Sequence, residues 1–429
     1  FPVTIQHTPG RGRCVVATAP LKRGQVALQC LPFSATVHPD QAMRRCSLCF
    51  KRGDGLQRCA ACGAEVYCSK ACQRAAWRAH HKAECGTLKR ARETLSAESV
   101  ADVLLAARVF RGRALPPPPV GEAVVPTQHD VFDMEVGPVT RSPLTTWLLS
   151  DGRALFGKAP LPPADDVDAV LARFQRNNFG VTDAIMSVVG AAVYPHGALL
   201  NHSCDPSAVV TYSYTGGHVQ TFRCLRDVEP GEELTHCYVD VMTPTRERLK
   251  QLSAVYGFRC DCGRCTSPDT PAREAVLSAT LDSGEPPARV AADLQAADAL
   301  ARQAAAMDDL PRECGLLAEA LALRQKHLHA HHVDVLGATQ ALMQTRMVAG
   351  VSAAGLCADV VATYTHVYGA GHVMTGLQWF TLGQLLQGEG AAGRALDAYV
   401  KARAVFSVTH GVGSEFVVSL DALIEAVSG

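Results

Sequence analysis

Residues 198–212 read ALLNHSCDPSAVVTY, and residues 256–265 read YGFRCDCGRC. The second stretch contains three cysteines in a CxCxxC pattern: Cys260, Cys262 and Cys265. Three thiolates are one ligand short of a tetrahedral zinc site, and Cys204 in the first stretch is the candidate for the fourth. Free surface thiols are the alternative, but this dense spacing argues against them. The sequence therefore predicts a structural zinc ion that joins two distant stretches.

A second cysteine-rich segment, residues 46–85, has enough ligands for two more zinc ions. Its candidate ligands form four pairs: Cys46 with Cys49, Cys59 with Cys62, Cys68 with Cys72, and Cys85 with either His80 or His81. Ligands separated by two residues form a tight knuckle around a metal ion, and wider gaps suit one side of a helix turn. Eight ligands leave no coordination position for water, which predicts structural sites. Disulfides or a redox pair are the alternative.

This segment resembles the MYND zinc finger, including Tyr67-Cys68-Ser69 and the tryptophan Trp77 ahead of the histidines. The resemblance implies that the first and third pairs share one zinc ion and that the second and fourth share the other. His81 has the family's gap of three residues before Cys85, whereas His80 has the usual distance from Trp77. One residue is inserted, so the choice between the two imidazoles stays open.

Asn201-His202-Ser203-Cys204 resembles the NHSC signature of SET-domain lysine methyltransferases, and the CxCxxC stretch resembles their post-SET zinc site. Either motif alone would be weak evidence, because polar turns and glycine turns are common. Three further pieces occur in the family's order: the turn Pro9-Gly10-Arg11-Gly12-Arg13, the stretch Asn177-Asn178-Phe179, and Pro230-Gly231-Glu232-Glu233-Leu234-Thr235 followed by Tyr238. Together they predict a SET domain.

The resemblance implies S-adenosylmethionine as the methyl donor. The cofactor-binding residues that it implies are Gly10, Arg11, Gly12, Asn177, Asn201, His202, Tyr238 and Phe258. Tyr238 corresponds to the family's catalytic tyrosine, whose hydroxyl would orient the lysine amine and whose ring would favour a cationic transition state. Tyr256 and Phe258 would form the walls of the lysine channel. A half-buried core tyrosine is the alternative for Tyr238.

The finger interrupts the SET motifs, and this split resembles the SMYD family, which combines SET and MYND domains. The expected fold class is α+β: a β-rich, pseudoknot-type SET domain, the inserted finger, a post-SET zinc site and an all-α tetratricopeptide-like C-terminal domain. The expected boundaries are 1–45 for the first SET part, 46–85 for the finger, 86–240 for the SET insertion and core, 241–268 for the post-SET region, and 269–429 for the helical domain.

Helical periodicity supports this organisation. In the C-terminal part it predicts six helices, near 291–306, 313–331, 333–349, 353–368, 374–389 and 391–408. Residues 86–115 and 141–175 are also expected to be helical, and the four prolines at 116–119 to form an extended surface loop. A plain helical bundle is the alternative for the C-terminal part. The histidines His327, His329, His331 and His332 favour a solvated polar face over a metal site.

Composition restricts the function classes. The chain has 41 Lys and Arg against 41 Asp and Glu, which does not suggest a nucleic-acid binder. No apolar run reaches the ~18 residues that a membrane span needs. Eleven of the 17 cysteines lie in the two clusters, which indicates a reducing compartment, cytoplasmic or nuclear. The chain begins with Phe1 rather than methionine, which leaves a preceding segment open.

Two functions are compatible with these features. The first is methyl transfer to lysine side chains of histones or other proteins by a monomeric enzyme with three structural zinc ions. The second is a catalytically weak or silent adaptor that regulates chromatin, whose finger binds proline-containing peptides and whose helical domain binds partners. Asn201, His202 and Tyr238 are all present, although a silent relic would be free to lose them. Their presence favours the enzyme.

Overall fold

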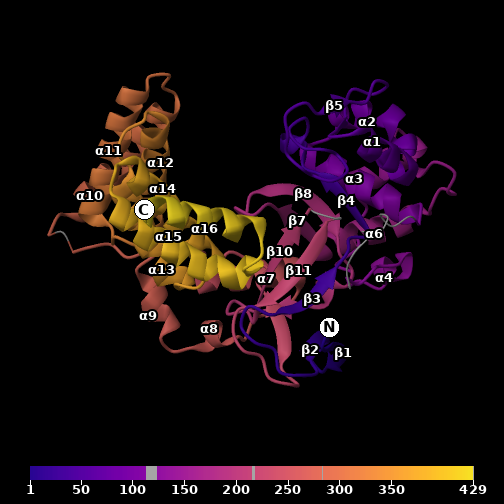
Figure 1. Ribbon diagram of the computed structural model, residues 1–429, viewed down its shortest axis with the longest axis horizontal. Coiled ribbons are helices and arrows are strands. Elements are labelled where there is room, and N and C mark those ends of the chain that lie inside the picture. Colours follow the sequence, from indigo (N-terminus) through magenta and orange to yellow (C-terminus); the bar gives the residue numbers. More distant parts are fainter. Residues whose placement is uncertain (113–122, 215–217, 283, 429) are drawn as a thin grey trace. The chain divides into compact units, whose positions relative to one another are not determined.

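The computed structural model describes residues 1–112, 123–214, 218–282 and 284–428. The expected proline loop at 116–119 lies outside these residues. The chain divides into two compact units, one formed by Phe1–Tyr238 with Gln251–Arg259 and the other by Val239–Lys250 with Cys260–Gly429. Among the described residues, the strands all lie in the first unit, and the second unit is helical (Figure 1). The expected α+β fold class is confirmed.

The sheet that matters most for function is four-stranded, in the order β1-β2-β12-β9. Its strands are β1 (Val3–Thr8), β2 (Gly12–Ala17), β12 (Glu233–His236) and β9 (Asn201–His202). Strand β12 pairs antiparallel with β2 on one side and parallel with β9 on the other. Apolar side chains such as Val15 and Leu234 are buried beneath it. The glycine turn, the NHSC stretch and the segment before Tyr238 therefore meet in one sheet.

Two further three-stranded sheets complete the β-rich core of this unit. One pairs β10 (Ala208–Ser213) with β11 (Val219–Cys224) and β11 with β3 (Val26–Cys30). The other pairs β4 (Ser34–Val37) with β8 (Val188–Val193) and β8 with β7 (Asn178–Thr182). Their apolar residues share one core with the four-stranded sheet.

The zinc finger is inserted after β4. It contains β5 (Gln57–Arg58), β6 (Val66–Tyr67), α1 (Lys70–Ala76), the wider helical turn η2 (Trp77–His81) and α2 (Lys82–Thr94). Ser69 caps α1 by accepting a hydrogen bond from the Cys72 backbone N–H. The buried centre of the finger consists largely of the candidate ligands with Tyr67 and Ala76. So small an apolar core depends on metal ions for its stability.

A helical layer with its own apolar core follows the finger. It is formed by α3 (Ala97–Phe110), α4 (Gln128–Phe132), α5 (Pro143–Leu149), the short turn η3 (Arg153–Phe156) and α6 (Ala164–Asn177). The expected helix over 86–115 is present as α2 and α3, with Ser96 capping the second. The expected helix over 141–175 is broken, because Gly157 has a φ of 62° and prolines follow it.

Two buried contacts hold the finger against the sheets. Phe50, directly after the first knuckle, is fully buried in the sheet core, and its ring centroid lies 4.0 Å from that of His218. Gly190 is required opposite it, because a Cβ there would lie 2.5 Å from the Phe50 ring. His218 Nε2 donates a hydrogen bond to the Leu48 carbonyl at 2.6 Å. The finger is thus anchored through both an apolar and a polar contact.

The second contact is a buried ionic network around Glu84 on α2. Arg108 on α3 donates to both Glu84 oxygens, at 2.7 and 2.8 Å, and to the Ala35 carbonyl of β4 at 2.6 Å. Arg111 donates to the same carboxylate at 2.7 Å. Burial alone would raise the pKa of Glu84, but Arg108 and His80 hold it well below its usual value. A fully paired buried carboxylate of this kind fixes the orientation of α2 relative to α3 and β4.

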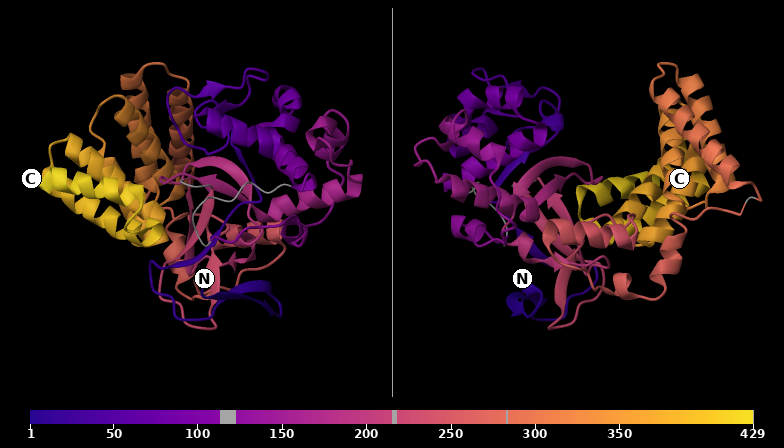
Figure 2. Two further views of the ribbon diagram at one scale, coloured as in Figure 1. Left: turned by 45° about the vertical axis from the view of Figure 1, so that its right-hand side comes forward. Right: turned by 180° about the vertical axis from the view of Figure 1, so that it is seen from behind.

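The second unit contains the short helices α8 (Gly263–Thr266) and α9 (Thr270–Ala275), preceded in the chain by α7 (Thr245–Tyr256). The long helices that follow are α10 (Pro287–Ala305), α11 (Leu310–His327), α12 (Val333–Val348), α13 (Ala354–Tyr368), α14 (Val373–Gly388), α15 (Ala392–Phe406) and α16 (Glu415–Ser428). Each long helix packs against the next, and Figure 2 shows these helices in orange to yellow. No helix among the described residues is long and apolar enough to cross a membrane.

All six helices expected in this unit are confirmed to within a few residues, and α16 is an addition. Its buried residues Val417 and Leu420 are three positions apart, a spacing that could have predicted it. The histidine cluster does not form the expected solvated polar face, because His327 and His332 are buried. His327 Nε2 lies 2.8 Å from Asp293, and His331 Nδ1 lies 3.0 Å from the Thr363 hydroxyl. The expectation of a solvated face is therefore wrong for the two buried histidines.

We expect Phe50→Ala to destabilise the first unit by about 3–5 kcal/mol, because it leaves a cavity in the sheet core and removes an anchor of the finger. Equilibrium unfolding in denaturant measures this change. Ile185→Ala, at a side chain that is 52% exposed, is the control and should stay within about 0.5 kcal/mol of wild type. Equal stability of the two variants would contradict the anchoring role of Phe50.

Candidate active site and zinc centres

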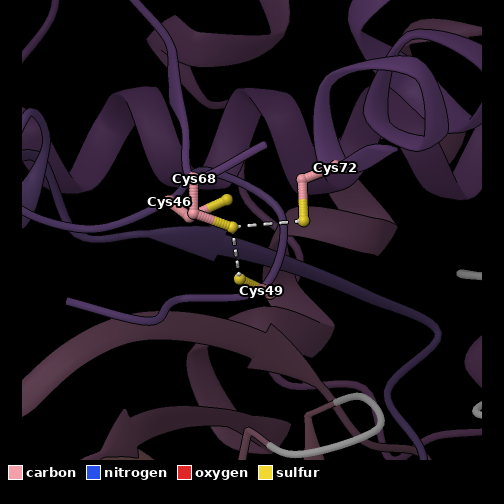
Figure 3. A group of neighbouring side chains, drawn as sticks. All are labelled: Cys46, Cys49, Cys68 and Cys72. Carbon is pink, nitrogen blue, oxygen red and sulfur yellow. Dashed lines mark hydrogen bonds between the residues drawn. The ribbon is translucent and has the colours of Figure 1, made fainter. Parts of the chain in front are cut away.

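The first candidate zinc centre consists of Cys46, Cys49, Cys68 and Cys72, whose sulfur atoms all lie within 4.8 Å of one another. Figure 3 shows the four side chains converging from the first knuckle, the end of β6 and helix α1. Cys68 Sγ lies 3.6 Å from Cys49 Sγ and 3.5 Å from Cys72 Sγ. Four converging thiols fit one tetrahedral zinc ion.

The second centre consists of Cys59, Cys62, His81 and Cys85. His81 Nε2 lies 3.4 Å from Cys59 Sγ and 3.6 Å from Cys62 Sγ. Burial lowers the pKa of His81 to about 4, so its ring is neutral, which is the form that binds metals. The grouping of the first pair with the third and of the second pair with the fourth is confirmed.

His80 lies outside both groups. Its Nδ1 is 3.0 Å from Glu84 Oε2 and 3.0 Å from an Arg108 nitrogen, within the buried ionic network. The choice that the sequence left open is therefore made by helix geometry. Residues four apart lie on the same face of a helix. His81 therefore lies on the same face as Cys85, and His80 lies on the same face as Glu84. This periodicity was available in the sequence once the segment was taken as helical.

The third group brings together Cys204, Cys260, Cys262 and Cys265, with all sulfur atoms within 4.8 Å of one another. The three groups use twelve residues, four for each ion. Their composition, eleven thiols and one imidazole with no carboxylate, is that of structural zinc sites. The expectation of three zinc centres is confirmed.

The glycine turn between β1 and β2 forms one side of the candidate cofactor site. Gly10 and Gly12 have φ values of 78° and 70°, and a Cβ at either position would meet no atom within 4 Å. Asn201 Nδ2 donates to the Arg11 carbonyl at 3.3 Å and to Glu233 Oε1 at 2.8 Å. Arg11 Nε in turn lies 2.9 Å from Glu233 Oε2. The turn is thus fixed to β9 and β12, with open space beside its glycines.

His202 serves as a support for Tyr238. Its Nδ1 accepts a hydrogen bond from the Tyr238 backbone N–H at 2.9 Å, so the ring proton is on Nε2, which lies 3.2 Å from Cys204 Sγ. Both ring nitrogens are engaged within the protein. The imidazole therefore positions Tyr238, and a contact of His202 with the cofactor stays a prediction.

Tyr238 is half-buried in a cluster of rings. Its hydroxyl donates to the Leu200 carbonyl at 2.7 Å, and burial, then the nearby Tyr256, raises its pKa well above the usual value. The hydroxyl therefore keeps its proton. The ring centroids of Tyr238 and Tyr256 are 4.9 Å apart, those of Tyr256 and Phe258 6.4 Å, and those of His202 and Phe258 5.9 Å. The expected channel residues lie together.

Asn177, at the end of α6, has a different environment. Its side-chain nitrogen donates to the Arg173 carbonyl at 2.7 Å and to the Glu135 carbonyl at 2.8 Å. These contacts tie the helix end to a loop, and a contact with the cofactor stays a prediction. Sequence reasoning named Phe179 only as part of a motif and did not single out His236; their rings stack with centroids 5.6 Å apart beside Tyr238. The period of two along β12, which puts His236 on the face of buried Leu234, could have found the second.

Zinc content tests the assignment of the imidazoles. We expect three zinc ions per chain in protein purified without added metal, two in His81→Ala and three in His80→Ala. His80→Ala should still lose about 1–3 kcal/mol of stability, because Glu84 loses a buried partner. Elemental analysis and denaturant unfolding give the two readouts. Loss of zinc in His80→Ala with retention in His81→Ala would reverse the assignment.

Comparison with known proteins identifies the family to which the chain belongs. Residues 12–239 match the family model of the SET domain. Histone-lysine N-methyltransferase SMYD3 of Homo sapiens is 33% identical over 61% of this chain and 61% of its own length. N-lysine methyltransferase SMYD2 of Bos taurus is 29% identical over 61% of this chain and 60% of its length.

Histone-lysine N-methyltransferase ASHR1 of Arabidopsis thaliana is 23% identical over 98% of this chain and 94% of its length. The chain spans about 61% of the length of SMYD3, the first of these relatives. These relatives confirm the resemblance to SMYD proteins, and the SET match covers more than half of the 429 residues. The chain therefore belongs to the SET domain family.

Proposed function

We propose that the protein transfers a methyl group from S-adenosylmethionine to the side-chain amine of lysine residues in proteins. The observation that carries this proposal is the protonated hydroxyl of the half-buried Tyr238, held by the Leu200 carbonyl at 2.7 Å among aromatic rings. Methyl transfer needs alignment and exclusion of water more than it needs a strong base. A neutral tyrosine in a ring-lined site suits that requirement.

The residues around the glycine turn fit the cofactor. When bound, S-adenosylmethionine supplies a methyl group on a sulfonium sulfur, and the carbon–sulfur bond breaks as the carbon–nitrogen bond forms. Gly10 and Gly12 would let the backbone approach the ligand closely, because no side chain occupies the adjacent space. Arg11 and Glu233 place one cation and one anion beside the turn, matching the carboxylate and ammonium of a methionine group.

Tyr238, Tyr256 and Phe258 would act on the lysine. The amine reacts through its lone pair, so it must enter in neutral form. The Tyr238 oxygen donates its own hydrogen to Leu200, which leaves its lone pairs to accept an amine N–H. The faces of the surrounding rings exclude water and favour the positive charge that the nitrogen acquires.

The names of the relatives support the same substrate class, since SMYD3 and ASHR1 are named as histone-lysine methyltransferases and SMYD2 as an N-lysine methyltransferase. Histones or other lysine-bearing proteins are therefore the proposed substrates, with proline-containing peptides as partners of the finger. A monomer in the cytoplasm or nucleus is the proposed form. A silent adaptor is not favoured, because His202 accepts a hydrogen bond from the Tyr238 backbone N–H and Asn201 donates one to Glu233 beside the glycine turn.

We expect Tyr238→Phe to lower methyl transfer by about 10²–10⁴-fold while S-adenosylmethionine binding stays nearly unchanged. The ring still packs, but the amine loses its acceptor. Transfer of labelled methyl groups to a panel of histones and other proteins measures the rate, and calorimetry measures cofactor binding.

Tyr194→Phe is the matched control, because the Tyr194 hydroxyl also donates to a backbone carbonyl, that of His218, at 2.7 Å. It should cost about 1 kcal/mol of stability and leave the turnover number close to wild type. Similar turnover of Tyr238→Phe and wild type on a verified substrate would remove Tyr238 from the reaction.

A further inference from the structure

His236 is a buried histidine with an unusual lack of partners. It lies on β12 two residues before Tyr238 and is 6% exposed. Neither ring nitrogen has a partner in good hydrogen-bonding geometry among the described residues, although an interaction with the Cys237 backbone favours the protonated ring and His202 disfavours it. Within the described part of the chain, several histidines have one buried ring nitrogen without a partner, but only His236 has two.

The surroundings of His236 are aromatic. Its ring centroid lies 4.8 Å from that of Tyr238, 5.6 Å from that of Phe179 and 5.4 Å from that of Phe222. Burial, with a small contribution from His202, lowers the pKa of His236 to about 3. The imidazole is therefore neutral near pH 7, with one N–H donor and one nitrogen acceptor.

An imidazole in this position lowers the free energy of unfolding, and folding gives no reason to keep it. Each buried polar atom without a partner costs about 1–3 kcal/mol, which a leucine or phenylalanine would avoid. Buried polar atoms without partners are rare in proteins and often mark a site that a ligand completes. The ligand expected beside Tyr238 is the lysine amine, which brings two N–H donors.

We propose that His236 is a positioning residue that accepts one N–H of the lysine amine while the Tyr238 hydroxyl accepts the other, and that this pair restricts the enzyme to monomethylation. The inference rests on the proposed function of the site. With both hydrogens held, the lone pair of the amine has one direction left, toward the methyl donor.

The stoichiometry explains the restriction. In the first transfer the nitrogen lone pair forms the new carbon–nitrogen bond, the carbon–sulfur bond breaks with its electron pair kept by sulfur, and the resulting methylammonium later loses a proton to water. The secondary amine then has one N–H. For a second transfer, its methyl group must take the place of one accepted hydrogen, against either His236 or Tyr238. This leaves a polar atom unpaired and places carbon against it.

The test compares His236→Leu with His236→Gln in the full chain. Wild type should convert an unmethylated lysine peptide to the monomethyl product and stop. His236→Leu removes the acceptor, so the rate on a monomethylated peptide relative to an unmethylated one should rise about 10-fold or more, with di- and trimethyl products in mass spectra. His236→Gln keeps an acceptor and should retain a mainly monomethyl product.

His218→Leu is the matched control. His218 is also buried, with a pKa lowered by burial to about 4, but its Nε2 has a partner in Leu48. This variant should lose stability without changing the ratio of products. Dimethylation or trimethylation by wild type, or an unchanged ratio in a folded His236→Leu, would overturn the inference. If His236→Leu does not fold, His236→Phe replaces it with the same expected ratio.

A binding experiment separates this inference from the proposed function. With ¹⁵N-labelled histidine, n-butylamine should shift the His236 ring nitrogen resonances of wild type, and N-methylbutylamine should shift them less. Failure of wild type to methylate any lysine would refute the proposed function, whereas absence of a shift on amine titration would refute the role of His236 whatever the enzyme activity.

Discussion

The structure of the candidate site depends on β12 having partners on both edges. Its first half pairs antiparallel with β2, Glu233 opposite Val16 and Leu234 opposite Val15, and its second half pairs parallel with β9, Thr235 opposite Asn201 and His236 opposite His202. A change of register by one residue would turn every side chain of β12 to the opposite face. The buried Leu234 makes such a slip costly. Segments more than two hundred residues apart in sequence are held in one alignment by four residues.

The same reasoning explains how a zinc finger can interrupt such a domain. The finger has little apolar core of its own, so its metal ligands and the contacts at its ends determine its position. Phe50 enters the sheet core, and Glu84 receives hydrogen bonds from Arg108 and Arg111. A buried carboxylate without these partners would be strongly destabilising. The network therefore permits few orientations of the finger relative to the helix that carries the arginines. The apolar contact of Phe50 and the ionic network of Glu84 together determine the orientation of the finger.

The motifs predicted the architecture well because their spacing reflects local geometry. Knuckles, the glycine turn and the CxCxxC pattern each describe a few residues that bind or turn together, and the helices of the second unit follow from periodicity. Choices that depend on tertiary neighbours were harder. The pairing of His80 with Arg108 and the break after Phe156 depend on packing or on prolines outside the periodic pattern. The two backbone acceptors of Asn177 lie four and forty-two residues away in sequence, and no motif encodes the second.

The two histidines that face each other across β9 and β12 show why burial alone does not reveal a role. His202 has partners for both ring nitrogens, in the Tyr238 backbone and Cys204, and so it contributes rigidity. His236, opposite it in register, is as well buried and has a partner for neither nitrogen among the described residues. A core selected for stability alone would satisfy or remove such a group. His202 holds Tyr238 in place, whereas in our proposal His236 leaves a hydrogen-bond acceptor for the lysine amine.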